Sequence, residues 1–252
     1  MVGAMKTEVL TAVIAAPVVG SFLGLVIDRL PAGRPIIAGR SVCDGCGRVL
    51  HWLDLIPLFS FLLWRGRCRV CGCRLTVFYL VIELAAAGVV VSAALVLSGE
   101  LFWVSLGLGW LLLVLAVIDQ RQLILPDRLT LPLIPTGLGV AYLIDPALLD
   151  AHVIGAIVGM IAFTLIAIIY RALRGHEGLG MGDAKLLAGV GAWLGWAALP
   201  GVVLLAAFTA LSFGVLQLVT DEKADVRGEI PFGPHLAFAF WASWLLGPLM
   251  LV

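Results

Sequence analysis

Residues 101–119 read LFWVSLGLGWLLLVLAVID, an uncharged apolar run that closes on an acid, Asp119. A helix needs about 20 mostly apolar residues to cross the hydrocarbon core of a bilayer. This stretch therefore predicts a transmembrane helix with a carboxylate at one end. Apart from Glu83, charged side chains are also missing from the other long apolar runs, which are 9–27, 75–99, 129–144, 153–170, 186–220 and 230–252.

The run 186–220 is too long for one span, and Leu199-Pro-Gly201 in its middle is a typical helix breaker. Splitting it there gives eight spans. The chain is 62% hydrophobic and 13% charged, whereas soluble domains carry about 25% charged residues. We therefore expect an all-α, polytopic membrane helical bundle of about eight transmembrane helices. A net charge of zero gives no indication of nucleic-acid binding, no removable secretory signal is evident, and the sequence predicts no oligomeric state.

Basic residues are distributed unequally between the two sides of this bundle. With the N-terminus outside, four segments face the cytoplasm: 28–74, 119–128, 171–185 and 221–229. Of the 16 lysines and arginines, Lys6 alone lies on the other side. Cytoplasmic loops of membrane proteins carry such an excess, so we expect a multi-pass membrane protein with its N-terminus outside.

The segment 28–74 is the one candidate for a separately folded unit, which divides the chain into a first helix (1–27), a cysteine loop (28–74) and a helical domain (75–252). All five cysteines lie in this loop. Two C-x-x-C pairs favour a structural, ribbon-like zinc site, with free thiols or a redox pair as the alternative. Cys73 falls outside both pairs and has no predicted role. The predicted ligands are Cys43, Cys46, Cys68 and Cys71.

The basic residues of this loop are explained by topology, or alternatively by contact with lipid phosphates or an acidic partner. Glu83, about two turns into the second span, either pairs or snorkels, or is a buried functional acid.

Two acids lie at span ends on the predicted cytoplasmic face. Asp119 closes one span, and Asp183 opens another after Gly180 and Gly182, which leave room for close approach of a second chain. Two carboxylates that share one proton can activate water and polarise a peptide carbonyl. The alternative is that both acids merely flank helices. From helix-dipole direction we expect Asp183 to be ionised and Asp119 to be protonated.

Several further motifs accompany the acids in order along the chain. Near the N-terminus these are Gly20-Ser-Phe-Leu and Asp28-Arg-Leu-Pro31. The loop contains Asp54-Leu-Ile-Pro57, and Glu83-Leu follows it. Beyond Asp119 come Leu125-Pro-Asp127, Gly180-Met-Gly-Asp183-Ala-Lys-Leu and Pro231-Phe-Gly-Pro234. Together with the cysteine pairs, these motifs resemble the bacterial type IV prepilin peptidases, almost end to end.

The resemblance implies that Asp119 and Asp183 cleave the leader peptide of prepilins or of type II secretion pseudopilins. Gly180, Gly182, Asp127 and Lys185 would support this motif. The resemblance also implies methylation of the new N-terminus with S-adenosyl-methionine. The family commonly has Asn where this chain has Gly24, and the chain contains no Asn.

Two other functions are weighed against this one. The first is a G-x-G-D intramembrane protease of broader specificity, which the cysteine loop and the L-P-D motif disfavour. The second is a proton-coupled transporter. Relay acids of transporters lie near mid-bilayer, whereas both aspartates here lie at span ends.

Overall fold

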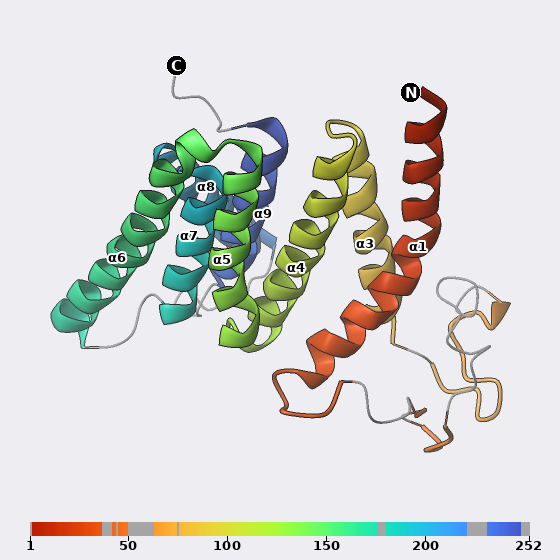
Figure 1. Ribbon diagram of the computed structural model, residues 1–252. Helices are drawn as coiled ribbons and strands as arrows, with labels where there is room; N and C mark the ends of the chain where they lie inside the picture. The colour runs from red at the N-terminus through yellow and green to blue at the C-terminus, as the bar shows by residue number, and fades with distance from the viewer. Residues whose placement is uncertain are drawn as a thin grey trace. The chain divides into compact units, whose positions relative to one another are not determined.

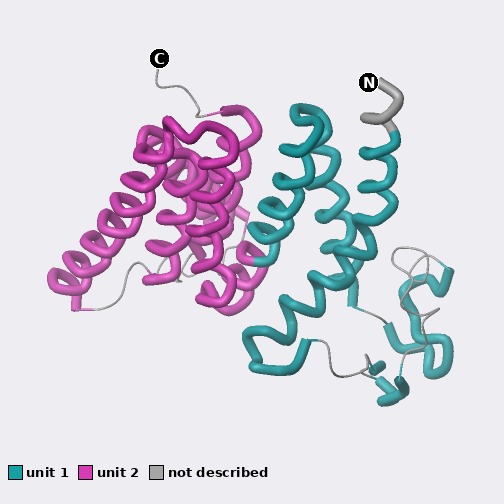
Figure 2. Tube along the Cα trace, in the orientation of Figure 1, with its two compact units in different colours: residues 1–114 teal, residues 115–252 magenta. Residues whose placement is uncertain are grey.

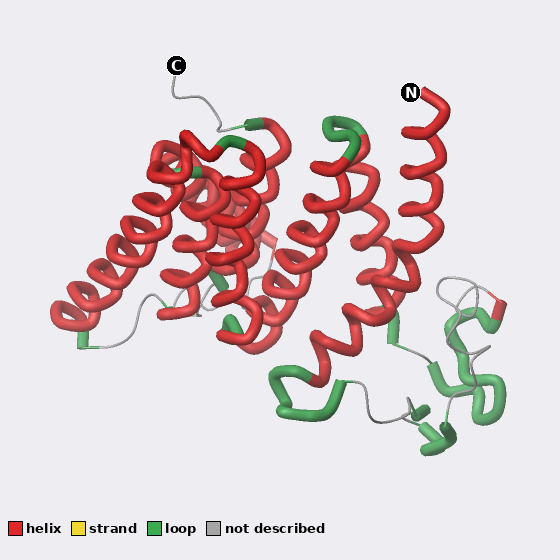
Figure 3. The backbone as a smooth tube through the Cα atoms, viewed as in Figure 1, coloured by secondary structure: helices red, strands yellow, loops and turns green. Residues whose placement is uncertain are grey.

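The computed structural model describes residues 2–36, 42–43, 45–49, 63–74, 76–175, 180–220 and 231–247. Within these ranges the chain consists of helices and loops (Figure 3), and β structure is limited to two isolated bridges, Val42–Val49 and Arg67–Arg74. The all-α prediction is confirmed. The helices in chain order (Figure 1) are α1 (Val2–Arg29), α3 (Phe78–Ala94), α4 (Glu100–Gln122), α5 (Asp127–Ile144), η2 (Pro146–Leu148), α6 (Leu149–Arg174), α7 (Met181–Leu194), η3 (Trp196–Ala198), α8 (Leu199–Thr220) and α9 (Gly233–Leu246).

Four helical segments of the described chain are long and apolar enough to cross a membrane: Thr7–Arg29, Glu100–Gln122, Pro146–Arg174 and Trp196–Thr220. Their length and composition indicate a membrane protein. Each remaining predicted span also coincides with a helix, but these helices are shorter. The 14 residues of α7, like the 14 of α9, extend about 21 Å, less than the roughly 30 Å of the hydrocarbon core.

The break in the run 186–220 lies earlier than predicted. α7 ends before Gly195, whose φ of 78° favours glycine. Pro200 is instead the second residue of α8, where its missing N–H removes no intrahelical hydrogen bond. The Pro-Gly pair therefore marks the start of a helix, and the preceding glycine ends the one before it.

The chain forms two compact units, Met1–Val114 and Leu115–Val252 (Figure 2). In the first unit α1 packs against α3. A Cβ on Gly20 would lie 2.6 Å from Cα of Glu83, and one on Gly24 would lie 2.7 Å from the Tyr79 ring. The two helices thus approach closely where α1 carries glycine.

In the second unit, α7 is the central helix. It packs against α5, α6, α8 and α9, and nearly all of its residues from Asp183 to Trp193 are buried. A Cβ on Gly191 would collide with the backbone carbonyl of Gly155 in α6, so these backbones touch, as small residues allow in membrane helix pairs. The Trp193 indole donates a hydrogen bond to the Leu133 carbonyl of α5 at 2.9 Å. Asp183 therefore lies on a helix that the surrounding helices hold in place.

Candidate active site

Asp183 is the third residue of α7. Gly180 caps this helix with extended backbone, φ −72° and ψ 143°, and the Asp183 N–H donates to the Gly180 carbonyl at 3.1 Å. Oδ2 of Asp183 lies against the same glycine, 3.3 Å from where a Cβ would stand. Gly180 therefore leaves the carboxylate room beside the backbone.

The space left by the missing side chain of Gly182 does not serve the predicted purpose, which was close approach of a second chain. A Cβ there would lie 2.6 Å from Cβ of Leu125, in the segment between α4 and α5. The space next to Gly182 is thus filled by this chain itself and is not open to a substrate. The contact fixes the L-P-D segment against the start of α7.

Asp119 lies in the last turn of α4, and its side chain is buried. Its Oδ2 accepts a hydrogen bond from the backbone N–H of Gly233, the first residue of α9, at 2.9 Å. A Cβ on Gly233 would lie 2.6 Å from the same oxygen. The first turn of a helix has N–H groups without an intrahelical acceptor, and here one of them binds the carboxylate.

Both acids lie in the second unit, near the ends of α4 and α7. Both are buried, and Asp183 experiences the charge of Asp119. Oδ1 of Asp183 is buried and has no hydrogen-bond partner among the described residues. A hydrogen bond to a charged group contributes about 1.5–3 kcal/mol, more than the about 0.3–1 kcal/mol of a helix dipole. The Gly180 backbone also donates to the Asp183 carboxylate, but Oδ1 of that acid has no partner among the described residues. The geometry therefore favours charge on Asp119, in contrast to the expectation, drawn from helix direction alone, that Asp183 carries it.

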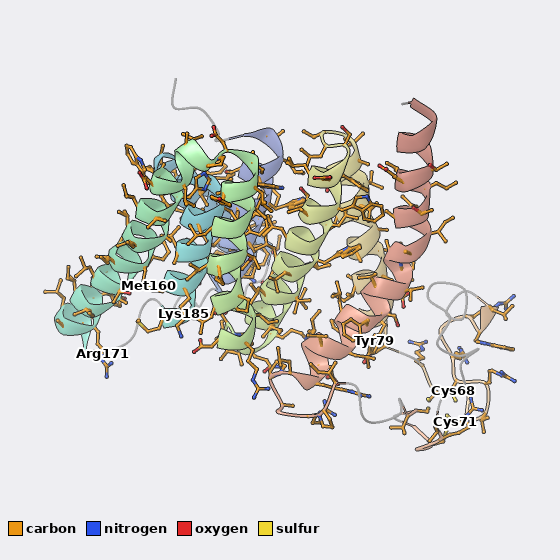
Figure 4. All side chains as sticks on the ribbon, in the orientation of Figure 1. Cys68, Cys71, Tyr79, Met160, Arg171 and Lys185 are labelled. Carbon is orange, nitrogen blue, oxygen red and sulfur yellow. The ribbon has the colours of Figure 1, made fainter. Side chains whose placement is uncertain are left out.

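Asp127 and Lys185 form an ion pair beside the acids. Asp127 is the first residue of α5, and its Oδ1 lies 2.5 Å from Nζ of Lys185 on α7. Figure 4 labels Lys185 near the end of α7 that carries Asp183. The pair connects the starts of two neighbouring helices.

The cysteine loop contains two turns with matching hydrogen bonds. In the first, the Cys43 N–H donates to the Arg48 carbonyl and the Gly47 N–H to the Cys43 carbonyl, at 2.8 Å each. Twenty-five residues on, the Cys68 N–H donates to the Cys73 carbonyl at 2.9 Å and the Gly72 N–H to the Cys68 carbonyl at 3.0 Å. Gly47 and Gly72 have φ of 67° and 68°. The two C-x-x-C pairs are therefore two copies of one knuckle turn.

The four predicted zinc ligands form one cluster. The Sγ atoms of Cys43, Cys46, Cys68 and Cys71 all lie within 4.8 Å of one another. Tetrahedral zinc with Zn–S bonds of about 2.3 Å separates its sulfurs by about 3.8 Å, and Sγ of Cys43 lies 3.8 Å from Sγ of Cys71. The side chains present thus fit a zinc site with four thiolate ligands. Figure 4 labels Cys68 and Cys71 in this loop.

The first thiol of each knuckle favours its ionised, metal-binding form. Hydrogen bonding from the Cys46 backbone, and then from the Cys73 thiol, lowers the pKa of Cys43 to about 6. Hydrogen bonding from the Cys71 backbone likewise lowers the pKa of Cys68. Cys73, which the sequence left without a role, lies 3.3 Å from Cys43, sulfur to sulfur.

Comparison with known proteins finds two family profiles that match the chain. The profile of the bacterial peptidase A24 N-terminal domain matches residues 14–97, and that of the type IV leader peptidase family matches residues 106–215. A protein of Burkholderia pseudomallei named "Prepilin leader peptidase/N-methyltransferase" is 39% identical, over 94% of this chain and 84% of its own.

The chain belongs to the type IV leader peptidase family. Proteins of the same name from Aeromonas hydrophila and Pseudomonas aeruginosa are 37% and 33% identical. They cover 91% and 95% of this chain, and 87% and 90% of their own. A comparison with solved structures finds no significant match.

Sequence reasoning missed two residues that contact the predicted site. Gly233 and Leu125 were noted within motifs, but not as the neighbours of Asp119 and Gly182. Pro234 after Gly233 signals a helix start, yet nothing in the sequence says which acid that helix faces. The motif Asp54–Pro57, and Arg40, Lys223 and Arg227 of the predicted cytoplasmic segments, lie outside the described residues.

Proposed function

We propose that the chain is a membrane aspartic endopeptidase that removes the leader peptide of type IV prepilins or type II secretion pseudopilins. Asp119 and Asp183 are its catalytic acids. The observation that carries the proposal is the pair of buried, interacting carboxylates at the ends of α4 and α7, in a member of the leader peptidase family.

A carboxylate pair at close range holds one proton between its two members. The ionised acid takes a proton from water, whose oxygen attacks the scissile carbonyl carbon. The protonated acid donates to the carbonyl oxygen, which becomes a hydroxyl of the tetrahedral intermediate. The C–N bond then breaks as a proton passes to the leaving nitrogen. Gly180, Gly182, Asp127 and Lys185 hold the start of α7, and so Asp183, in place.

In the membrane, we propose eight spans with the N-terminus outside and both acids at the cytoplasmic face of the bacterial inner membrane. Within the second unit, basic residues at helix ends support this orientation. Arg121 lies in the last turn of α4, Arg128 in the first turn of α5, and Arg171 and Arg174 in the last turn of α6. Each lies at the end of its helix that connects toward Asp119 or Asp183, as the positive-inside rule expects.

The loop 28–74 is proposed as a separate cytoplasmic unit held by one structural zinc ion. Four cysteines leave no open coordination position, so the metal would supply folding energy and no chemistry. The matching knuckles and the clustered thiols support this. The loop's arginines, Arg65 and Arg67 among them, would contact anionic lipid headgroups.

A second activity, methylation of the new N-terminus with S-adenosyl-methionine, is supported by the name of relatives that cover nearly the whole chain. This chain's Gly24 is relevant, because a side chain there would lie 2.7 Å from the Tyr79 ring. An Asn at position 24 would require that ring to move. Tyr79 therefore occupies the space that the family's usual residue would fill, and the methylating activity would have to operate without that residue.

The deciding experiment is cleavage of a purified prepilin by the purified, detergent-solubilised chain. Wild type should release the leader, whereas Asp119→Asn and Asp183→Asn should each abolish cleavage and still insert in the membrane. Asp127→Asn is the matched control, because it removes a neighbouring carboxylate, and it should retain more activity than either. Full activity of either dyad variant would refute the assignment. Cleavage of unrelated membrane substrates at equal rates would favour the broader protease.

A further inference from the structure

We propose that the backbone N–H of Gly233 holds Asp119 as the ionised member of the pair, so that the shared proton resides on Oδ1 of Asp183. The inference rests on the proposed peptidase function and goes further, because it assigns each acid its chemical role. It also makes Gly233, at the start of α9, a positioning residue for catalysis.

The first step concerns Asp119. Its Oδ2 accepts the Gly233 N–H at 2.9 Å in a buried setting. That N–H belongs to the first turn of α9, a helix of 14 residues, where amide donors are free and the helix dipole is positive. A hydrogen bond donated to the charged form stabilises that form. Asp119 is therefore supplied with a fixed donor for its negative charge.

The second step concerns Asp183. Its Oδ2 lies against Gly180, but Oδ1 is buried without a partner among the described residues. A buried carboxylate oxygen that accepts no hydrogen bond is costly. Protonation converts this oxygen into a donor, which can bind the carbonyl oxygen of a substrate. Asp183 is thus the acid better suited to hold the proton.

The third step considers the other charges on the packed helices. Lys185 is paired with Asp127. The Gly180 backbone donates a hydrogen bond that favours charge on Asp183, whereas the charge of Asp119 opposes it. α8 carries no titratable residue, and the His235 ring of α9 lies against Phe213. In the described chain, the Gly233 N–H is the group that acts on Asp119 to favour its charge. The remaining charged side chains on α4, α5 and α6 near this end are Arg121, Arg128, Arg171 and Arg174.

The roles follow from this assignment. Asp119 is the base that takes a proton from the attacking water. Asp183 Oδ1 donates its proton to the scissile carbonyl oxygen. The location of Asp183 next to Gly180 agrees with this role, because glycine has no side chain to cover the backbone beside the acid. A Cβ at residue 233 would stand 2.6 Å from Oδ2 of Asp119, so only glycine supplies the N–H without displacing the carboxylate.

Replacing one backbone amide tests the inference without adding an atom. The full chain is made by cell-free synthesis in lipid nanodiscs with glycolic acid at position 233, which turns the Gly233 amide into an ester and removes its N–H. The matched control replaces residue 236 by its hydroxy acid, because the Leu236 N–H donates within α9 to Phe232 at 3.0 Å. The pH dependence of kcat/KM for a prepilin is measured for both and for wild type.

The two possible assignments predict opposite changes. If Asp119 carries the charge in the active form, losing its donor weakens the singly ionised state relative to the doubly protonated one. The acidic limb of the profile then moves up by about one pH unit, and the basic limb stays. If Asp183 carried the charge, only the doubly ionised state would lose the hydrogen bond, and the basic limb would move. A shift of the basic limb alone, or no shift, overturns the inference.

An infrared measurement gives a readout that needs no cleavage. With 13C in the aspartate side-chain carboxyls, the protonated C=O band at pH 7 should be present in wild type and in Asp119→Asn, and absent in Asp183→Asn. The reverse pattern overturns the assignment. Failure of wild type to cleave any prepilin would refute the proposed function, while the spectra would still decide where the proton resides.

Discussion

Nζ of Lys185 lies 2.5 Å from Oδ1 of Asp127, and this pair connects the second residue after Asp183 to the first residue of α5. The side chain of Asp127 is 58% exposed and that of Lys185 is 23% exposed. Water therefore screens the pair, and exposed ion pairs contribute only about 0.2–1 kcal/mol. The ion pair therefore contributes little to the stability of the fold, and its expected role is to fix the position of α7.

We accordingly predict a small coupling energy between the two residues. In a double-mutant cycle of Lys185→Gln and Asp127→Asn, the coupling in unfolding free energy should stay below about 1 kcal/mol. The fall in kcat/KM should be similar in the single and double variants, because either change releases the same contact. Additive losses in kcat/KM would show that the residues act separately.

Gly233 and Gly182 should respond differently to alanine. Gly233→Ala places a Cβ 2.6 Å from Oδ2 of Asp119, so the carboxylate must shift, and a displacement of about 1 Å costs about a hundredfold in rate. We expect kcat to fall by that order, with thermal stability nearly unchanged. Gly139→Ala on α5 is the control, since no described atom lies within 4 Å of its Cβ position, and it should keep full activity.

Gly182→Ala should act mainly through stability. Its Cβ would lie 2.6 Å from Cβ of Leu125, an atom close to the backbone that has little freedom to move. Overpacking of this kind costs about 1–3 kcal/mol. Thermal unfolding in detergent measures it, and the double variant Gly182→Ala/Leu125→Ala should leave the stability loss in place, because a Leu125→Ala side chain retains the clashing Cβ. Full recovery in that variant would contradict the packing described.

Metal analysis of the purified chain should find about one zinc ion per molecule. Cys43→Ser and Cys68→Ser should each abolish retention of the ion, since both thiols are buried in the cluster. Cys73→Ser is the matched control from the same loop and should retain it. Loss of zinc should destabilise the loop and leave the acid chemistry intact. A zinc-free chain with normal protease resistance of the loop would exclude a structural metal.

Reporter fusions test the topology. A fusion after residue 100 or 150 should report the outside, and one after residue 60, 122 or 178 should report the cytoplasm. The arginine asymmetry is the reason. A cytoplasmic signal at residue 150 would contradict the eight-span arrangement, because α5 and α6 would then not cross the membrane separately.

Much of the helical framework could be predicted from the sequence, because uncharged runs have few alternatives to helix in a bilayer. The ends of those helices were harder. Gly195, and not Pro200, terminates α7, since a proline in the first turn is compatible with a helix and a glycine at positive φ is not. The sequence indicated a helix break in this region, but not which residue ends the first helix and which begins the second.

The same contrast between predictable and unpredictable features applies to the candidate site. Asp119 and Asp183 could be proposed as catalytic acids from their positions at span ends, and four cysteines as metal ligands from their spacing. Their neighbours could not, because Gly233 reaches Asp119, and Leu125 reaches Gly182, through packing between helices far apart in sequence. The charge assignment based on helix direction failed to include that hydrogen bond, which is stronger than a dipole.

The distance along the chain between Asp119 and its donor, 114 residues, has a consequence for biosynthesis. The ribosome releases the segment bearing Asp119, and then the one bearing Asp183, well before α9 is made. A nascent chain at that stage contains both acids but not the amide that binds Asp119. In the proposed mechanism, proteolytic competence therefore arises only after α9 has been synthesised and has docked, so a nascent chain that still lacks α9 cannot cut neighbouring proteins at the translocon.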